Sequence, residues 1–130
     1  MRRLETTLLA IAVSCCLPLA AVAAATVLSP LQIKATFGTG APFRSTSPAG
    51  VVYTLVLKAD GTASRAPKGS TAATTGTWRL SDTGYCSKWG KNAENCYTIQ
   101  VNANKYAVLD AKGKLAANWT PAATAAPAKP

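Results

Sequence analysis

The sequence predicts an all-β fold in which an antiparallel meander closes into a small barrel, preceded by one short N-terminal helix. Short runs rich in β-branched and aromatic residues follow one another along the chain. Turn-forming residues such as Gly, Asp and Asn separate the runs, and apolar residues alternate with polar ones inside them. This combination is typical of consecutive antiparallel strands. The seven predicted strands cover residues 51–58, 62–66, 75–81, 85–89, 96–102, 105–110 and 114–119.

The predicted helix lies in residues 30–37, ahead of the sheet. Ser29 is a favourable N-cap, Pro30 suits the first helical position, and Gln32 completes a capping box. Gly38 stands where a left-handed C-cap glycine is common. A helix of two turns is unstable alone, so its apolar residues must pack against the sheet.

The connections follow from turn chemistry. Residues 39–50 are rich in Gly, Pro, Ser and Thr and predict a loop, interrupted by a short strand at Phe43 and Arg44. Asp60 and Gly61 have the signature of a tight hairpin turn. Residues 67–74 predict a further loop.

Alternation places aromatic and aliphatic side chains on one face of the sheet and mostly Thr, Lys, Arg and Gln on the other. Trp78, Trp89 and Tyr97 belong to the apolar face, whereas Arg79 and Lys88 belong to the polar face. A sheet with one apolar face must curl or be covered, so this face becomes the barrel interior. The three tryptophans of the chain either fill the core or line a ligand cavity.

Cys86 and Cys96 lie on adjacent predicted strands and predict a cross-strand disulfide. If they face each other, Tyr85 faces Tyr97 and both cysteines point to the polar face. A bond closing so short a loop stabilises the fold by roughly 2–3 kcal/mol in the chain-entropy model, and it indicates an oxidising compartment. The alternative is a redox or metal pair. The spacing is not C-x-x-C, and the chain has no histidine to complete a zinc site, so we expect no metal.

Residues 1–25 predict a cleaved signal peptide and hence a periplasmic or secreted protein. A positively charged start precedes a nearly continuous apolar stretch at 8–25, which ends in small residues. We expect cleavage after Ala23 or Ala25, with no stable membrane span afterwards. The alternatives are a transmembrane helix that is retained and lipidation at Cys15.

The rest of the chain is long enough for one domain. We assign residues 26–119 to a single barrel-like domain. Residues 120–130 contain only Ala, Pro, Thr and Lys, which lack the apolar bulk needed for packing. These residues therefore predict a disordered tail.

The net positive charge of the chain limits the classes of partner that its surface would attract. Lys and Arg number 14 against 5 Asp and Glu. Such a surface favours anionic partners, for example phosphates, acidic polysaccharide or anionic lipid. The alternative is a soluble, basic secreted protein whose charge serves no recognition. The basic residues are scattered, without a run of adjacent cations, and together with the predicted export this argues against a nucleic-acid partner.

An ordinary catalytic site is hard to build from this sequence. The absence of histidine excludes an imidazole base and the common triads. The carboxylates beyond the leader stand in turns or loops or at a strand end, and none is spaced like a glycosidase pair. There is also no glycine-rich phosphate loop. We therefore expect a non-enzymatic protein, with no catalytic residues and no cofactor. The four carboxylates are Asp60, Asp82, Glu94 and Asp110.

Several short motifs occur in a fixed order between residues 28 and 119. They are Leu28-Ser29-Pro30, Asp60-Gly61-Thr62, Gly76-Thr77-Trp78-Arg79, Tyr85-Cys86-Ser87-Lys88-Trp89, Cys96-Tyr97 and Lys112-Gly113-Lys114. This order resembles a group of small exported proteins of Gram-negative bacteria, mainly proteobacteria, described as uncharacterised or lipocalin-like. The resemblance implies a periplasmic or secreted, lipocalin-like antiparallel β-domain. It brings no catalytic residues.

Two functional hypotheses follow from these features. The leading one is an exported, non-enzymatic β-domain that binds a small apolar ligand or an envelope component, with Trp78, Trp89 and Tyr97 as candidate ligand contacts. The second is an electrostatic interaction protein for anionic envelope polymers or lipids, which would use Arg79 and Lys88. A lysozyme-inhibitor-like role is less favoured, because lysozymes are commonly basic and would repel a basic partner.

Overall fold

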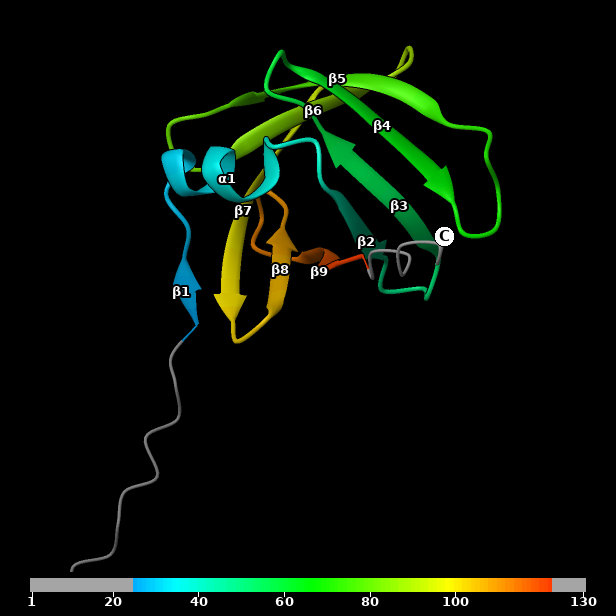
Figure 1. The fold of residues 1–130 in the computed structure, drawn as a ribbon. Coiled ribbons are helices and arrows are strands. Elements are labelled where there is room, and N and C mark those ends of the chain that lie inside the picture. Colours follow the sequence, from blue (N-terminus) through cyan, green and yellow to red (C-terminus); the bar gives the residue numbers. More distant parts are fainter. Residues whose placement is uncertain (1–24, 123–130) are drawn as a thin grey trace, which may run out of the picture.

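The protein folds as the all-β barrel that the sequence predicts (Figure 1). The structure, a computed structural model, describes residues 25–122. Its elements, in chain order, are β1 (Thr26–Val27), α1 (Pro30–Phe37), β2 (Pro42–Thr46), β3 (Val52–Leu57), β4 (Thr62–Pro67), β5 (Thr74–Leu80), β6 (Tyr85–Trp89), β7 (Asn95–Asn102), β8 (Lys105–Leu109) and β9 (Leu115–Pro121).

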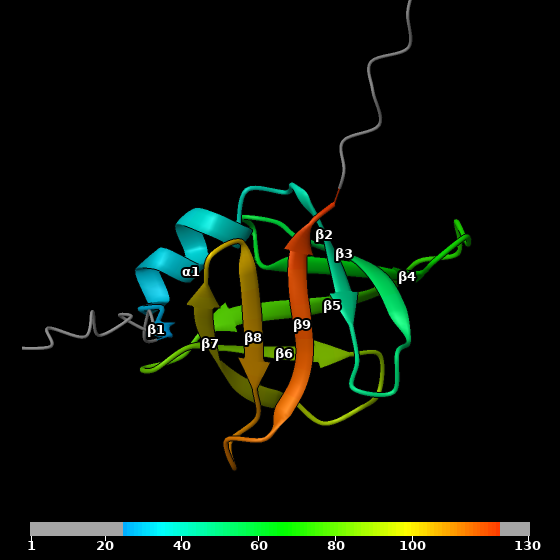
Figure 2. The same cartoon turned by 90° about the horizontal axis from the view of Figure 1, so that it is seen from below.

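Within these residues, β2 to β9 form a closed antiparallel barrel of eight strands. Each strand pairs with its neighbours in the sequence, and β9 pairs with β2 to close the ring. Figure 2 shows β8 and β9 crossing steeply in front of β5 and β6. Because consecutive strands from β2 to β9 pair antiparallel, their connections alternate between the two ends of the barrel. We call the end with the β2–β3, β4–β5, β6–β7 and β8–β9 connections the mouth.

The helix α1 plugs the end opposite the mouth. The predicted capping box is present, since the Ser29 Oγ accepts from the Gln32 N–H and the Gln32 Oε1 accepts from the Ser29 N–H. Ile33 and Phe37 are fully buried against the barrel, whereas Leu31 is 76% exposed. The short helix thus gains its stability from packing, as its length requires.

The predicted left-handed C-cap at Gly38 is wrong, because its φ is −77°. Glycine is needed there for a different reason. A Cβ at Gly38 would lie 2.8 Å from the Lys34 carbonyl oxygen and 3.1 Å from the Trp78 ring, so the helix backbone and the indole both crowd this position. The Trp78 Nε1 also donates to the Lys58 carbonyl at 2.8 Å. Trp78 therefore ties α1 to β5 and to the β3–β4 turn.

Two strands differ from the sequence-based expectation. The short strand predicted at Phe43 and Arg44 is the centre of the five-residue β2, which pairs with β3 and with β9. The two-residue β1 was not predicted, and it pairs with the second half of β7 beyond the end of β6. Both segments have partners for their backbone groups that local sequence does not reveal.

The predicted boundaries agree with the structure only in part. β9 runs through Thr120 and Pro121, so the first residues of the predicted tail are ordered in the sheet. Residues 1–24 of the predicted leader (1–25), the lipidation predicted as an alternative at Cys15, and residues 123–130 of the tail lie outside the described residues. In the described part of the chain, no helix is long and apolar enough to cross a membrane.

The predicted faces of the sheet are largely confirmed. A β-bulge near the start of β9 is an exception: Leu109 pairs with Leu115 and Val108 with Ala117, so Ala116 is passed over. Val51, the first residue of the strand predicted at 51–58, precedes β3 and is 46% exposed. The buried inward residues of the strands include Leu55, Leu57, Ala63, Trp78, Tyr85, Ser87, Ile99, Val108 and Trp119.

The cross-strand disulfide lies in the predicted register. Cys86 pairs with Cys96 and Tyr85 pairs with Tyr97. The two sulfurs are bonded, 1.97 Å apart. Cys86 is fully buried although it lies on the outer face, whereas Cys96 is exposed. The bond fixes β6 to β7 close to the mouth.

Candidate functional site

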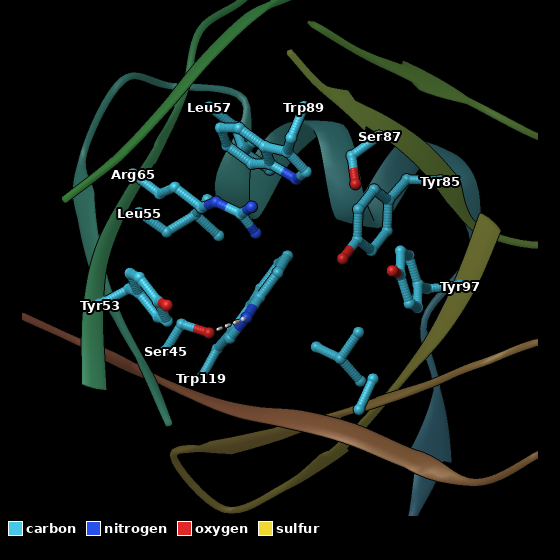
Figure 3. A pocket seen from close by; sticks show the side chains of 12 residues that line it. Ser45, Tyr53, Leu55, Leu57, Arg65, Tyr85, Ser87, Trp89, Tyr97 and Trp119 are labelled. Carbon is cyan, nitrogen blue, oxygen red and sulfur yellow. Dashed lines mark hydrogen bonds between the residues drawn. The ribbon is translucent and has the colours of Figure 1, made fainter. Parts of the chain in front are cut away.

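A cavity of about 100 Å³ occupies the mouth half of the barrel interior (Figure 3). It is several times larger than the space of about 30 Å³ that one water occupies in the liquid. In Figure 3, α1 lies behind the lining side chains, so the helix closes the far end. Five of the twelve lining residues are aromatic, namely Tyr53, Tyr85, Trp89, Tyr97 and Trp119.

Three aromatic rings of the cavity wall contact one another. The Tyr85 and Tyr97 rings are stacked, with centroids 5.4 Å apart, and Tyr85 lies equally far from the Trp119 ring. The Trp119 Nε1 donates to the Ser45 Oγ at 3.1 Å, which fixes the indole against β2. Tyr85 and Trp119 are buried, so this part of the wall is held in place by packing.

Arg65 is the one cation in the cavity wall. It follows Ala63 by two positions on β4, and Ala63 is buried, so alternation turns Arg65 inward as well. Its guanidinium carbon lies 4.4 Å from the centroid of the Trp89 ring and 5.6 Å from that of Tyr53. Figure 3 shows the guanidinium pointing into the cavity from the wall opposite Tyr85 and Tyr97.

The tyrosine hydroxyls across from Arg65 stay protonated at neutral pH. Burial raises the pKa of Tyr85 well above its usual 10.0. Burial also raises the pKa of Tyr97, against the positive charge of Arg65, which lowers it. Both groups can therefore donate hydrogen bonds into the cavity.

The predicted ligand contacts separate into two groups. Trp89 and Tyr97 line the cavity, and they lie near its mouth. Trp78 does not belong to the cavity wall; it packs against Gly38 at the plugged end. Sequence reasoning overlooked Arg65 as a site residue, because the weak apolar pattern of β4 does not show which of its residues point inward.

The two cations predicted on the polar face lie outside the barrel. Arg79 forms a two-point ion pair with Glu94, with Nη2–Oε1 and Nε–Oε2 distances of 2.6 and 3.1 Å. The hydrogen bonds from Arg79 lower the pKa of Glu94. Lys88 is exposed and pairs in register with Thr77. The charge of Arg79 is therefore already matched.

Glu94 also lies near the disulfide. Its carboxylate and the sulfurs of Cys86 and Cys96 are all within 4.8 Å of one another. Three such atoms could hold a metal ion if the cysteines were thiolates. In the oxidised protein the sulfurs are bonded to each other, and only the Glu94 carboxylate remains as a ligand.

Comparisons of the chain with known protein families, with curated proteins and with solved structures found no match. The chemistry of the site follows from its own geometry. The aromatic wall can take up a flat apolar group, and hydroxyl and guanidinium donors at its edge can orient a polar substituent. The class that fold and site define is a small up-and-down β-barrel, plugged by a helix at one end and hollow at the other.

Proposed function

We propose that the protein is an exported, non-enzymatic binding protein that takes up a small ligand in the mouth half of its barrel. The observation that carries this proposal is the cavity of about 100 Å³ with its aromatic wall. Small-molecule sites are typically concave and mostly apolar, with a few polar groups that fix orientation. The wall around Tyr85, Trp89 and Arg65 has this composition.

The polar lining supports the same proposal. Ser87 is buried and points into the cavity from β6, as do Tyr85 and Trp89 on the same strand. A barrel that needs only stability gains more from aliphatic side chains at such inward positions. Polar groups at the edge of an apolar cavity instead favour recognition of a ligand.

Export is supported by the disulfide and by the sequence. Disulfides persist in oxidising compartments such as the periplasm or the extracellular space. The Cys86–Cys96 bond is consistent with the predicted leader and with the resemblance to small exported, lipocalin-like proteins. The periplasm or the exterior of the cell is thus the proposed location.

The second hypothesis, binding of anionic envelope polymers or lipids through the outer polar face, has less support. Arg79 already pairs with Glu94, and the charge of Lys88 also acts on Glu94. The field that this part of the surface presents to an anionic polymer is therefore weakened. If the hypothesis were right, association with purified anionic envelope material would fall steeply with added salt.

Titration with a neutral aromatic probe tests the proposed function. Benzyl alcohol is a small probe with one ring; benzene fills an engineered cavity of about 150 Å³, so in this smaller cavity part of the probe would extend toward the mouth. We expect affinity near 1 mM, or about −4 kcal/mol, for a ligand of this size. The measurement is ¹⁵N chemical-shift perturbation together with tryptophan fluorescence.

The location of the shifts decides the outcome. Saturable changes should concentrate at Trp89, Trp119 and the backbone around Ser87. Trp78 serves as an internal control, because it lies in the core away from the cavity. No saturable change with benzyl alcohol, or changes centred on Trp78, would argue against a binding cavity at the mouth.

A further inference from the structure

Arg65 is placed as a recognition group rather than as part of an ion pair. In residues 25–122, its guanidinium forms no salt bridge and no hydrogen bond with the protein. Three of the four carboxylates in these residues are engaged elsewhere: Glu94 binds Arg79, Asp60 accepts from Thr62, and Asp110 accepts from the backbone N–H groups of Lys112 and Lys114. The positive charge in the cavity is thus matched only by aromatic rings.

The stacking geometry leaves the donors of Arg65 free. The guanidinium lies over the Trp89 ring at 4.4 Å, and such contacts cover the face of the planar group. Its N–H donors lie in the plane, so they remain available to a ligand in the cavity. The Trp89 ring itself is held close to the backbone at Gly76, where a Cβ would lie 2.7 Å from the indole. The cation is therefore pre-oriented.

The opposite wall contributes donors of the same kind. The hydroxyls of Tyr85 and Tyr97 point toward Arg65 across the cavity (Figure 3). Burial raises the pKa of Tyr97 and the positive charge of Arg65 lowers it, so the two groups are within electrostatic reach of each other. A cavity that combines one cation with facing O–H donors and no carboxylate in its wall suits one negative charge.

We infer that the ligand is a small organic monocarboxylate with a flat apolar body, whose carboxylate pairs with Arg65 while its body packs against Trp89, Tyr85 and Trp119. This inference rests on the proposed function, because it names the ligand of the same cavity. The planar fork of arginine matches a carboxylate in a two-point hydrogen bond. The small cavity volume limits the body to about one ring.

The surroundings of the mouth favour the approach of an anion. Lysines stand in three of the mouth connections, namely Lys68, Lys91 and the pair Lys112 and Lys114. They outnumber the carboxylates in the same connections, and one of those carboxylates, that of Glu94, is neutralised by Arg79. A positive rim raises the local concentration of anions, and this effect weakens with salt.

The experiment compares benzoate with benzyl alcohol by ¹⁵N NMR titration of the oxidised protein. Benzoate should bind roughly ten to a hundred times more tightly than its neutral analogue, as expected for a charged hydrogen bond. In Arg65→Gln this advantage should vanish, so that both probes bind alike. Arg65→Lys, which keeps the charge but loses the fork, should retain part of it.

Arg44→Gln is the matched control. Arg44 is exposed on the outer side of β2, and its replacement removes the same unit charge from the protein. It should leave the benzoate affinity within about twofold of the wild-type value. Retained benzyl alcohol binding in Arg65→Gln shows that the cavity of the variant is intact.

Two results would overturn the inference. Equal affinity of the wild-type protein for benzoate and benzyl alcohol would show that the cavity does not recognise the charge, while the proposed binding function would stand. Undiminished benzoate binding in Arg65→Gln would show that Arg65 does not contact the ligand. The inference would then fail, while the proposed binding function would stand. If neither probe binds, both the inference and the proposed function fail.

Discussion

Replacing Phe37 by alanine tests whether α1 holds the barrel together. Phe37 is fully buried and is the contact point between the helix and three strands. Its ring makes edge-to-face contacts with centroids 4.7, 4.9 and 5.0 Å from those of Phe43, Tyr106 and Trp119. Truncation to alanine leaves a cavity among rings that are fixed by their strands and cannot collapse into it.

The expected cost of Phe37→Ala is about 3–5 kcal/mol of unfolding free energy, which includes the lost aromatic contacts. A domain of this size is stable by about 5–15 kcal/mol in total. The melting temperature should then fall by about 12–40 °C, from about 4–8 °C per kcal/mol. The variant would be close to the limit of folding at 37 °C.

Urea denaturation followed by tryptophan fluorescence measures this loss. Leu31→Ala is the control in the same helix, because Leu31 is 76% exposed and alanine keeps the helix propensity. We expect Leu31→Ala to change the free energy of unfolding by no more than about 0.5 kcal/mol. A loss below about 1 kcal/mol for Phe37→Ala, or equal losses for both variants, would refute the role of the helix as a plug.

Two further predictions concern the disulfide and the buried tyrosine. Replacing Cys86 and Cys96 together by serine should lower the free energy of unfolding by about 2–3 kcal/mol, since the bond spans a sequence separation of 10; an unchanged urea midpoint would contradict this. Burial raises the pKa of Tyr85 well above 10.0, so the unfolded chain releases this proton first. Stability should be full below pH 10 and decline as the pH rises above it, less steeply in Tyr85→Phe. Some decline should remain in Tyr85→Phe, because burial also raises the pKa of Tyr97. If the urea midpoint fell equally between pH 8 and pH 11 in the wild-type protein and in Tyr85→Phe, the decline would not come from Tyr85.

The sequence predicts the barrel well where the signals are local. Alternation and turn residues locate seven of the strands, and the pairing of Cys86 with Cys96 follows from the polar turn between them. The capping box at Ser29 is equally local, because all its partners lie within one turn of helix. These predictions succeed because neighbouring residues alone decide the structure.

The features that the sequence misses depend on distant partners. β2 lies in a segment of turn-forming residues and becomes a strand because β3 and β9 bond it on both edges. Gly38 is the residue type expected at a left-handed cap, but in the structure it packs closely against the Trp78 ring, which is forty residues away in the chain. The bulge at Ala116 reverses the alternation only because β8 fixes the register.

At the candidate site, too, the sequence predicts what local alternation decides and misses what depends on distant parts of the chain. Alternation places Trp89 and Tyr97 inside, yet it cannot tell which inward residues meet the helix plug and which face the open mouth. Trp78 and Trp89 therefore look alike in sequence, and only closure of the barrel separates them. Arg65 lies on a strand with a weak apolar pattern, so its inward position follows from pairing with β3 rather than from hydropathy.

The hollow mouth half makes the fold less stable than a fully packed barrel would be. Around this cavity of about 100 Å³ the side chains lack the close contacts that they would make with filling residues. Away from the mouth, Ile33, Phe37 and Ile99 are fully buried. At the mouth, the inward positions at Ser87 and Ala116 carry small side chains that leave the space open. Since larger aliphatic residues there would close the cavity, the choice of small and polar residues supports a ligand as the missing part of this core.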